Sequence, residues 1–182
     1  MKRKPEILNR REVARSRIFR VEERELRFPN GTVVRYERLL SGRNGAVLVV
    51  PMKDAETVFL IREYAAGTDR YELALPKGLV ADGESPIEAA NRELKEEIGH
   101  GAHRLEHINT LSVAPGYLEH ATLIILAQEL YEERLPGDEP EEIEVVPWSL
   151  RRLDELVVRE DCTEARSIAA LYIVREMLSN ES

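Results

Sequence analysis

The stretch that decides the fold reads Gly78-Leu-Val-Ala-Asp-Gly-Glu-Ser-Pro-Ile-Glu-Ala-Ala-Asn-Arg-Glu-Leu-Lys-Glu-Glu-Ile-Gly99. Three carboxylates, Glu93, Glu96 and Glu97, stand close together behind a glycine-containing loop. Mg²⁺ prefers oxygen ligands and is commonly shared between one or two carboxylates and the phosphates of a substrate. The stretch therefore predicts a helix that holds a hard divalent cation against a polyphosphate.

Local signals place the two ends of this helix. Ser85 is a good N-cap, Pro86 suits the first helical position, and Glu88 stands where a capping box has its acid. Gly99 is a natural C-terminal stop. Apolar residues recur between these ends at helical spacing and predict one buried face: Ile87, Ala90, Leu94 and Ile98.

The carboxylates need a counter-charge on this helix. Glu93 and Glu97 are four residues apart and share one flank, whereas Glu96 lies further towards solvent. Like charges at that spacing cost an isolated helix a few tenths of a kcal/mol, roughly. A divalent cation is the simplest compensation, and a solvated acidic face on a surface helix is the alternative.

The full pattern, from Gly78 through Glu84 to Arg92-Glu93-Leu-x-Glu-Glu-x-Gly99, resembles the Nudix box of hydrolases that cleave nucleoside diphosphates linked to another moiety. The position after the final glycine is usually aliphatic in that family and is His100 here. The resemblance covers residues 18–178. It implies the α/β/α sandwich of that family, an α+β fold with a mixed sheet.

Composition bounds the class of protein. The chain has 182 residues and 43% apolar residues, which fits one globular domain with a short extension. The net charge of −8 argues against a nucleic-acid partner and for a protein that needs cations to approach an anionic substrate. Cys162 is alone, so neither a disulfide framework nor a thiol metal site is expected. No apolar run reaches transmembrane length, which predicts a cytoplasmic protein without membrane contact.

The chain divides into an N-terminal module, residues 1–45, and a hydrolase domain, residues 46–182, with the box at 78–100. Residues 1–16 are charged and weakly periodic and predict a loose arm. Two alternating segments then flank Asn30-Gly31, a strong hairpin signal. Further strands are expected at residues 46–52, 58–64, 71–75, 105–113, 121–130 and 143–146, with two closing helices around residues 150–157 and 168–178. Helices and strands in this order indicate an α+β domain.

Three features outside the box resemble the ADP-ribose pyrophosphatase group. Pro115 lies sixteen residues beyond Gly99, as does the proline that marks that group, although it also reads as an ordinary turn proline. The N-terminal hairpin resembles strands that cross to the partner in a homodimer and complete its nucleotide pocket. The segment Gly137-Asp-Glu-Pro-Glu-Glu-Ile143 resembles a loop that supplies a base and a metal contact, and its alternative is a solvated acidic turn.

Finer similarity points to the branch called ADP compounds hydrolases, which act on NADH, ADP-ribose and diadenosine polyphosphates. It rests on three segments: residues 61–67, 71–73 and 75–78. Two positions depart from strict ADP-ribose enzymes, because Ala65 replaces their arginine and Lys77 replaces their alanine. Both departures favour the broader branch.

The resemblance and the chemistry of pyrophosphate cleavage imply roles for the acidic residues. We expect Glu93 and Glu97 to bind one Mg²⁺ with the backbone carbonyl of Lys77, Mn²⁺ being an alternative metal. Glu96 and Glu141 would hold a second ion, so that more than one ion serves the site. Paired ions neutralise phosphate charge and lower the pKa of an attacking water. The general base would be Glu139, or else Glu96.

The remaining candidates position or bind. Arg92 should orient the carboxylates by salt bridges, Glu84 should tie down the loop, and Gly78 and Gly99 should allow close packing. Arg62 matches phosphate oxygens bidentately. The other substrate-binding candidates are Tyr36, Glu37 and Arg38 from the partner chain near adenine, Tyr64 and Tyr117 on or beside a base, and Pro115. The alternative for each aromatic residue is a place in the core.

Other functions stay open at this point. A GDP-mannose or ADP-sugar pyrophosphatase would share the same box and differ in base and sugar preference. A non-catalytic ADP-ribose or NAD sensor would be expected to lose one of the box glutamates, and none is lost here.

Overall fold

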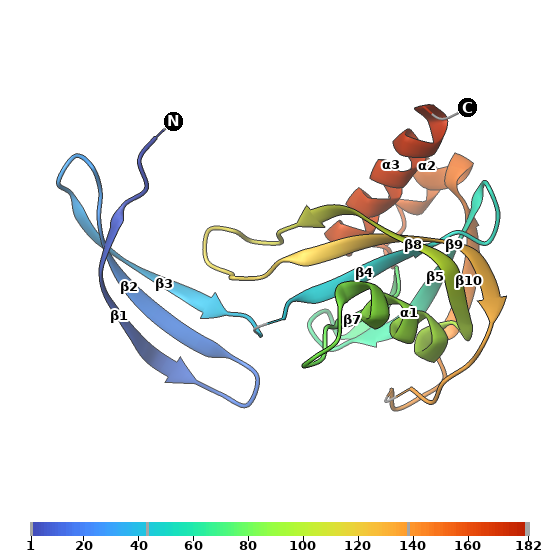
Figure 1. Cartoon of the computed structure of the whole chain (residues 1–182), viewed down its shortest axis with the longest axis horizontal. Coiled ribbons are helices and arrows are strands. Elements are labelled where there is room, and N and C mark those ends of the chain that lie inside the picture. Colours follow the sequence, from blue (N-terminus) through green and yellow to red (C-terminus); the bar gives the residue numbers. More distant parts are fainter. Residues whose placement is uncertain (1, 43, 138, 181–182) are drawn as a thin grey trace. The chain divides into compact units, whose positions relative to one another are not determined.

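The computed structural model describes residues 2–42, 44–137 and 139–180 (Figure 1). The chain forms two compact units, one of Met1–Gly45 with Ser112–Ala121 and one of Ala46–Leu111 with Thr122–Ser182. Each unit is described by itself below.

The first unit is an antiparallel sheet in the order β1-β2-β3, with β1 at Glu6–Arg15, β2 at Arg20–Arg27 and β3 at Val33–Leu40. The predicted hairpin is confirmed, and Gly31 N–H donates to the carbonyl of Phe28 at 2.9 Å in its turn. The loose arm predicted for residues 1–16 is wrong, because most of it is strand β1. Cross-strand ion pairs stabilise this charged strand, among them Arg11–Glu23 at 2.8 Å and Arg20–Glu12 at 2.9 Å.

The loop of residues 112–121 belongs to this unit because it pairs with the end of β3. Leu39 N–H donates to the carbonyl of Tyr117 at 2.7 Å, and Glu119 N–H donates to the carbonyl of Leu39 at 2.9 Å. Arg38 adds an ion pair to the Glu119 carboxylate at 2.8 Å. The N-terminal sheet therefore holds a segment that lies some eighty residues further along the chain.

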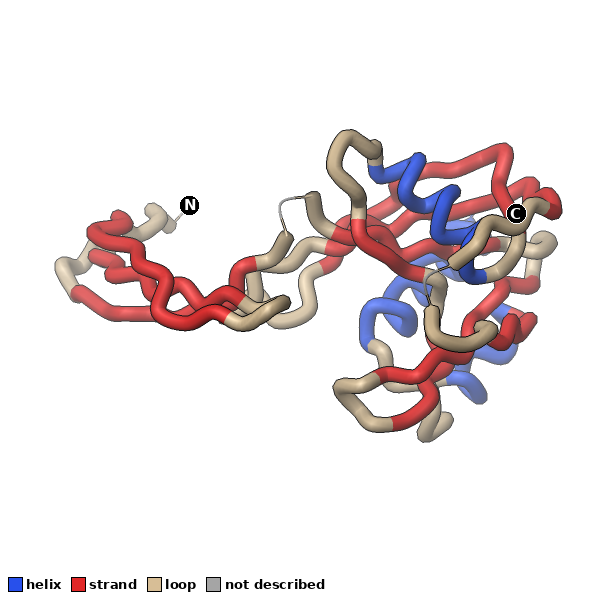
Figure 2. Tube along the Cα trace, turned by 90° about the horizontal axis from the view of Figure 1, so that it is seen from below, coloured by secondary structure: helices blue, strands red, loops and turns tan. Residues whose placement is uncertain are grey.

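The second unit contains two sheets (Figure 2). One is mixed, in the order β7-β4-β9-β8, and its β4–β9 pair is parallel. The other is antiparallel, in the order β10-β5-β6. Their strands are β4 (Ala46–Pro51), β7 (Lys77–Leu79), β8 (His100–Leu111) and β9 (Thr122–Glu132), then β5 (Thr57–Ala65), β6 (Arg70–Ala74) and β10 (Glu144–Ser149).

Helices cover both faces of the mixed sheet. Along β4, Leu48 and Val50 belong to the core that includes α3 (Ala165–Asn180), whereas Val47 and Val49 belong to the core under α1 (Pro86–Glu97). Alternate residues of a strand point to opposite faces, so β4 lies between two helical layers. A short 3₁₀ turn, Leu150–Arg152, and α2 (Leu153–Leu156) add to the α3 side. The expected α+β sandwich is confirmed.

The box helix starts and stops as predicted. Ser85 accepts a hydrogen bond from Glu88 N–H while the Glu88 carboxylate accepts from Ser85 N–H, which completes the capping box. Gly99 follows the helix with a φ of 72°.

Cys162 is buried, and burial raises the pKa of its thiol to about 11. Within the described residues no helix is long and apolar enough to cross a membrane.

Candidate functional site

The site is built around two carboxylates of α1 that are buried beneath the β7 backbone. Glu93 is 8% exposed and Glu97 is 3% exposed, an unusual situation for glutamate. A Cβ on Gly78 would stand 1.8 Å from Oε1 of Glu93, so the close approach requires glycine. Strand β7, which sequence analysis did not predict, thus covers the carboxylates.

Both carboxylates are hard to charge in the protein without a cation. Burial raises the pKa of Glu97 to about 9, although Lys77 N–H donates to its Oε2 at 3.0 Å. Burial also raises the pKa of Glu93 to about 7, against the opposing effect of Arg92. The Lys77 ammonium group forms an ion pair with the Glu63 carboxylate at 2.7 Å.

Arg92 connects the helix to the preceding loop. Its guanidinium donates to Oε1 and Oε2 of Glu84 at 2.9 and 3.1 Å and to the carbonyl of Leu79 at 3.0 Å. Its Nη1 also donates to Glu93 and to Glu96, each at 2.8 Å. Glu84 in turn accepts from Ala81 N–H at 3.0 Å. These bonds fix the loop and two of the carboxylates relative to α1.

The acidic loop between β9 and β10, described at residues 135–137 and 139–143, brings more carboxylates near α1. Glu96, Glu139 and Glu141 all line a cavity of about 280 Å³, together with Arg134. The charge of Glu139 contributes to the raised pKa of Glu93, which places the two carboxylates within electrostatic reach. Asp138 of the predicted loop lies outside the described residues.

A divalent cation fits the chemistry of this donor set. The donors are oxygens, as Mg²⁺ requires, and two of them are buried carboxylates whose charge needs compensation. Among the residues that the structure describes, however, no group of three His, Cys, Asp or Glu side chains lies close enough together to hold a metal ion. Arg92 provides the neighbouring positive charge for Glu93 and Glu96.

The predicted phosphate contact, Arg62, is engaged by protein carboxylates. Its Nε donates to Glu144 at 2.9 Å and its Nη1 to Asp161 at 2.5 Å. The residue therefore links β5 to β10 and to the segment before α3. A substrate phosphate would compete with two carboxylates for this guanidinium.

The other substrate candidates fall into both units. Tyr64 is half exposed on β5, and its hydroxyl donates to Asp69 at 2.6 Å. Within the first unit, Arg38 pairs with Glu22 at 2.9 Å and with Glu119. The remaining candidates of that unit are Tyr36 and Glu37 on β3, and Pro115 and Tyr117 in the loop that pairs with it.

Sequence analysis missed one residue with a direct bond to the acidic loop. The Tyr71 hydroxyl donates to Oε1 of Glu141 at 2.6 Å, and its ring lies 5.8 Å from that of Tyr64. Sequence analysis places Tyr71 in an expected strand, residues 71–75, and in a segment that resembles the family. Nothing local predicts a partner 70 residues away.

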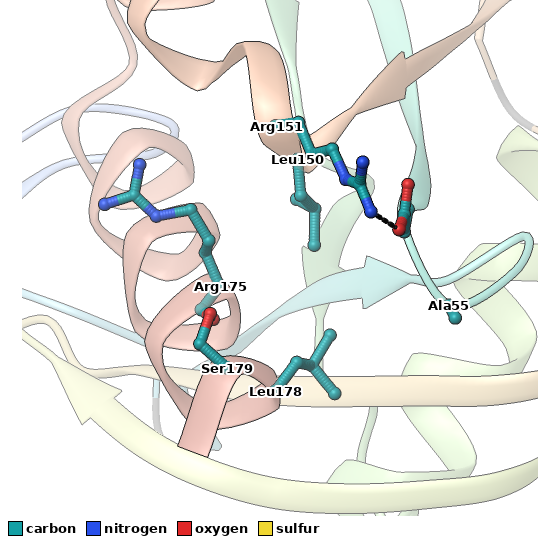
Figure 3. Close-up of a pocket in the computed structure, with 7 residues that line it drawn as sticks. Ala55, Leu150, Arg151, Arg175, Leu178 and Ser179 are labelled. Atoms are coloured by element: carbon teal, nitrogen blue, oxygen red, sulfur yellow. Dashed lines mark hydrogen bonds and ion pairs between the residues drawn. The ribbon is translucent and has the colours of Figure 1, made fainter. Parts of the chain in front are cut away.

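A second cavity, of about 480 Å³, contains none of these residues (Figure 3). Arg151 and Arg175 stand on its walls, and Arg151 is already paired with Glu56. Its other lining residues are Ala55, Leu150, Leu178 and Ser179. The convergent carboxylates lie at α1 and the acidic loop instead, which makes that region the candidate active site.

Two domain models, several curated proteins and a solved structure match this chain. Residues 42–171 match the NUDIX domain, and residues 5–38 match the NudE-type Nudix hydrolase N-terminal domain. The chain is 49% identical to the ADP compounds hydrolase NudE of Escherichia coli (strain K12), over 98% of this chain and 95% of that protein. It is 30% identical to the ADP-ribose pyrophosphatase of Bacillus subtilis (strain 168), over 92% and 94% of the two chains. A crystal structure of an ADP compounds hydrolase superposes with a TM-score of 0.92 at 48% identity, covering 100% of this chain and 98% of that one.

Proposed function

The chain belongs to the Nudix hydrolase family, and on that premise we propose that it hydrolyses the pyrophosphate bond of ADP-linked compounds, releasing AMP or ADP. The single observation that carries the chemistry is the buried pair Glu93 and Glu97 beneath the backbone of Lys77 and Gly78. The substrate class, which includes ADP-ribose, NADH and diadenosine polyphosphates, rests on the similarity to enzymes named for such substrates.

The acidic residues would hold the metal. Glu93 and Glu97, with the carbonyl of Lys77, are the proposed ligands of one ion, and Glu96 and Glu141 those of a second. Bound Mg²⁺ or Mn²⁺ supplies neutralisation of the phosphate charge and a lower pKa for the attacking water. The attacking water would give its proton to the carboxylate of Glu139, or else to that of Glu96. The water oxygen attacks phosphorus, and the bridging P–O bond breaks.

Arg92 and Glu84 serve as positioning residues in this proposal. Because Arg92 bonds to Glu84 and to Glu93 at once, it fixes the loop and the carboxylate in one arrangement. Such fixed geometry is the main contribution that a protein makes to phosphoryl transfer.

Substrate recognition is proposed to involve a homodimer. A second copy of the chain would supply β3 with Tyr36, Glu37 and Arg38 near the adenine, and Pro115, Tyr117 and Tyr64 would border the ligand. Arg62 stays a candidate for a phosphate contact, in competition with Glu144 and Asp161. The cytoplasmic location stays a prediction from the sequence.

Product formation by the purified protein tests the proposal. The substrates are ADP-ribose, NADH, diadenosine triphosphate, GDP-mannose and an ordinary nucleoside triphosphate, each with Mg²⁺ and with a chelator. AMP or ADP from several adenine-containing substrates, lost with the chelator, is the expected result. Cleavage of GDP-mannose alone would keep the chemistry and replace the substrate class, and tight binding without turnover would contradict an enzyme.

One variant tests the metal assignment. Glu97→Gln keeps the size of the side chain and removes the charge, so turnover should fall by about two orders of magnitude or more while the fold persists. Glu160→Gln, at an exposed position, is the matched control. Normal activity of Glu97→Gln would sink the assignment of Glu97 as a metal ligand.

A further inference from the structure

The bond between Tyr71 and Glu141 joins two distant parts of the second unit. The phenol of Tyr71, on β6, donates to Oε1 of Glu141 at 2.6 Å. A hydroxyl that donates to a carboxylate forms a charge-assisted hydrogen bond, which is short and about twice as strong as a neutral one.

This bond is a main anchor of the acidic loop. At the start of the loop, Leu135 N–H donates to the carbonyl of Lys95 at 3.1 Å, and at its far end β10 pairs with β5 from Glu144 onward. For the described residues in between, 136–137 and 139–143, the bond from Tyr71 is the one hydrogen bond to another element. Within these described residues, the loop is therefore held by one side-chain hydrogen bond to another element, besides the apolar packing of Ile143.

The anchor acts on Glu139, which lines the same cavity as Glu96 of α1. Glu139 and Glu141 are separated only by Pro140, whose ring fixes its own φ and keeps the preceding residue extended. Because this linkage is stiff, fixing Glu141 also restricts Glu139. Both carboxylates line the cavity that Glu96 shares.

We infer that Tyr71 is a positioning residue for the acidic loop: through Glu141 it holds the Glu139 carboxylate in the cavity that Glu96 also lines. The inference rests on the proposed function, because the value of that position lies in the hydrolysis. Tyr71 itself touches neither reacting atoms nor cation. Its ring packs edge-on against Tyr64 at 5.8 Å, which keeps the hydroxyl aimed at the loop.

Tyr71→Phe tests the inference, because it keeps the ring and removes only the hydroxyl. We expect turnover to fall about tenfold, as the loss of one charge-assisted bond implies. The Mg²⁺ concentration for half-maximal activity should rise severalfold, and the KM for substrate should change by less than about twofold. An unchanged Mg²⁺ midpoint together with unchanged turnover would overturn the inference.

Tyr64→Phe is the matched control for this measurement. It removes a hydroxyl of nearly equal exposure (47% for Tyr64, 48% for Tyr71) whose bond to Asp69 is also 2.6 Å long. With substrate held at a saturating concentration for each variant, the Mg²⁺ midpoint of Tyr64→Phe should stay at the wild-type value. An equal shift of that midpoint in both variants would assign the effect to the tyrosine pair and overturn the role of the loop anchor.

A double-mutant cycle separates positioning from general stability. If Tyr71 acts only through Glu141, adding Tyr71→Phe to Glu141→Ala should change neither turnover nor the Mg²⁺ midpoint further. Additive losses would contradict the inference.

Hydrogen exchange of the metal-free protein decides the anchor independently of activity. The amides of Leu135, Gly137, Glu139 and residues 141–143 should exchange faster in Tyr71→Phe than in wild type, and no faster in Tyr64→Phe. If wild type hydrolyses no substrate but the exchange result holds, the proposed function fails and the anchor stands. Unchanged exchange in Tyr71→Phe overturns the anchor whatever the activity.

Discussion

At the scale of single residues, Gly78 is the position where one added carbon matters most. Its missing side chain leaves room for the Glu93 carboxylate, which an added Cβ would approach to 1.8 Å. The clash falls on the end of a flexible side chain, so the fold can adjust but the carboxylate must move.

Gly78→Ala should therefore lose activity far more than stability. We expect turnover to fall at least about a hundredfold, with a loss of unfolding free energy of about 1 kcal/mol. Gly67→Ala is the control, because a Cβ there meets nothing within 4 Å. Steady-state rates and urea unfolding measure the two quantities, and a fully active Gly78→Ala would show that the close approach is dispensable.

Asp161 gives a prediction on pH. Hydrogen bonds from Arg159 and Arg62 hold the pKa of this carboxyl well below its usual range. A folded-state pKa below the unfolded value, about 3.9, adds stability above that value, and this stability is lost as pH falls towards the folded pKa. Asp161→Asn should thus cost about 1 kcal/mol at pH 7 and progressively less below pH 4, roughly.

Urea unfolding of wild type and Asp161→Asn at several pH values measures this difference. Asp154→Asn, at an exposed position, is the control. A difference between wild type and Asp161→Asn that does not shrink in acid would mean that packing, not charge, makes Asp161 important.

At the scale of elements, α1 owes its start to one side chain that has a defined energetic value. Ser85→Ala removes the acceptor for Glu88 N–H and should lower the unfolding free energy by about 1 kcal/mol. Ser179→Ala, at the exposed end of α3, should change it much less. Urea unfolding compares them, and equal losses would remove the capping box from the account of how α1 begins.

The contrast between α1 and other elements shows what a sequence can predict. The signals for α1 are local, from Ser85 to Gly99, and its limits were predicted correctly. Strand β1 is stabilised by cross-strand ion pairs such as Arg11–Glu23 rather than by an apolar face. Its sequence therefore lacks apolar alternation, and for this reason the prediction of a loose arm is wrong. Strand β7 has only three residues and exists through its pairing with β4. Likewise the box glutamates could be singled out from spacing, whereas the Tyr71–Glu141 bond depends on the folded chain.

At the scale of the whole molecule, the N-terminal unit is more than an appendage. Removal of residues 1–40 deletes β3 and with it the backbone partner of Tyr117 and Glu119. Under the dimer proposal it also deletes the residues expected to reach the partner's nucleotide. We expect the truncated protein to be monomeric and inactive, as measured by light scattering and product formation. An active monomer would refute the shared pocket.

The pairing of β3 with residues 112–121 also has an evolutionary consequence. Two separate stretches of the gene encode this unit, one for residues 1–45 and one for residues 112–121. The two stretches meet where Leu39 bonds to Tyr117 and Glu119. Recombination at residue 45 would bring in a foreign β3 and leave the native loop opposite it. The backbone bonds would form in any chimera, whereas the ion pair between Arg38 and Glu119 depends on both stretches, so substitutions at these two positions should be inherited as a pair.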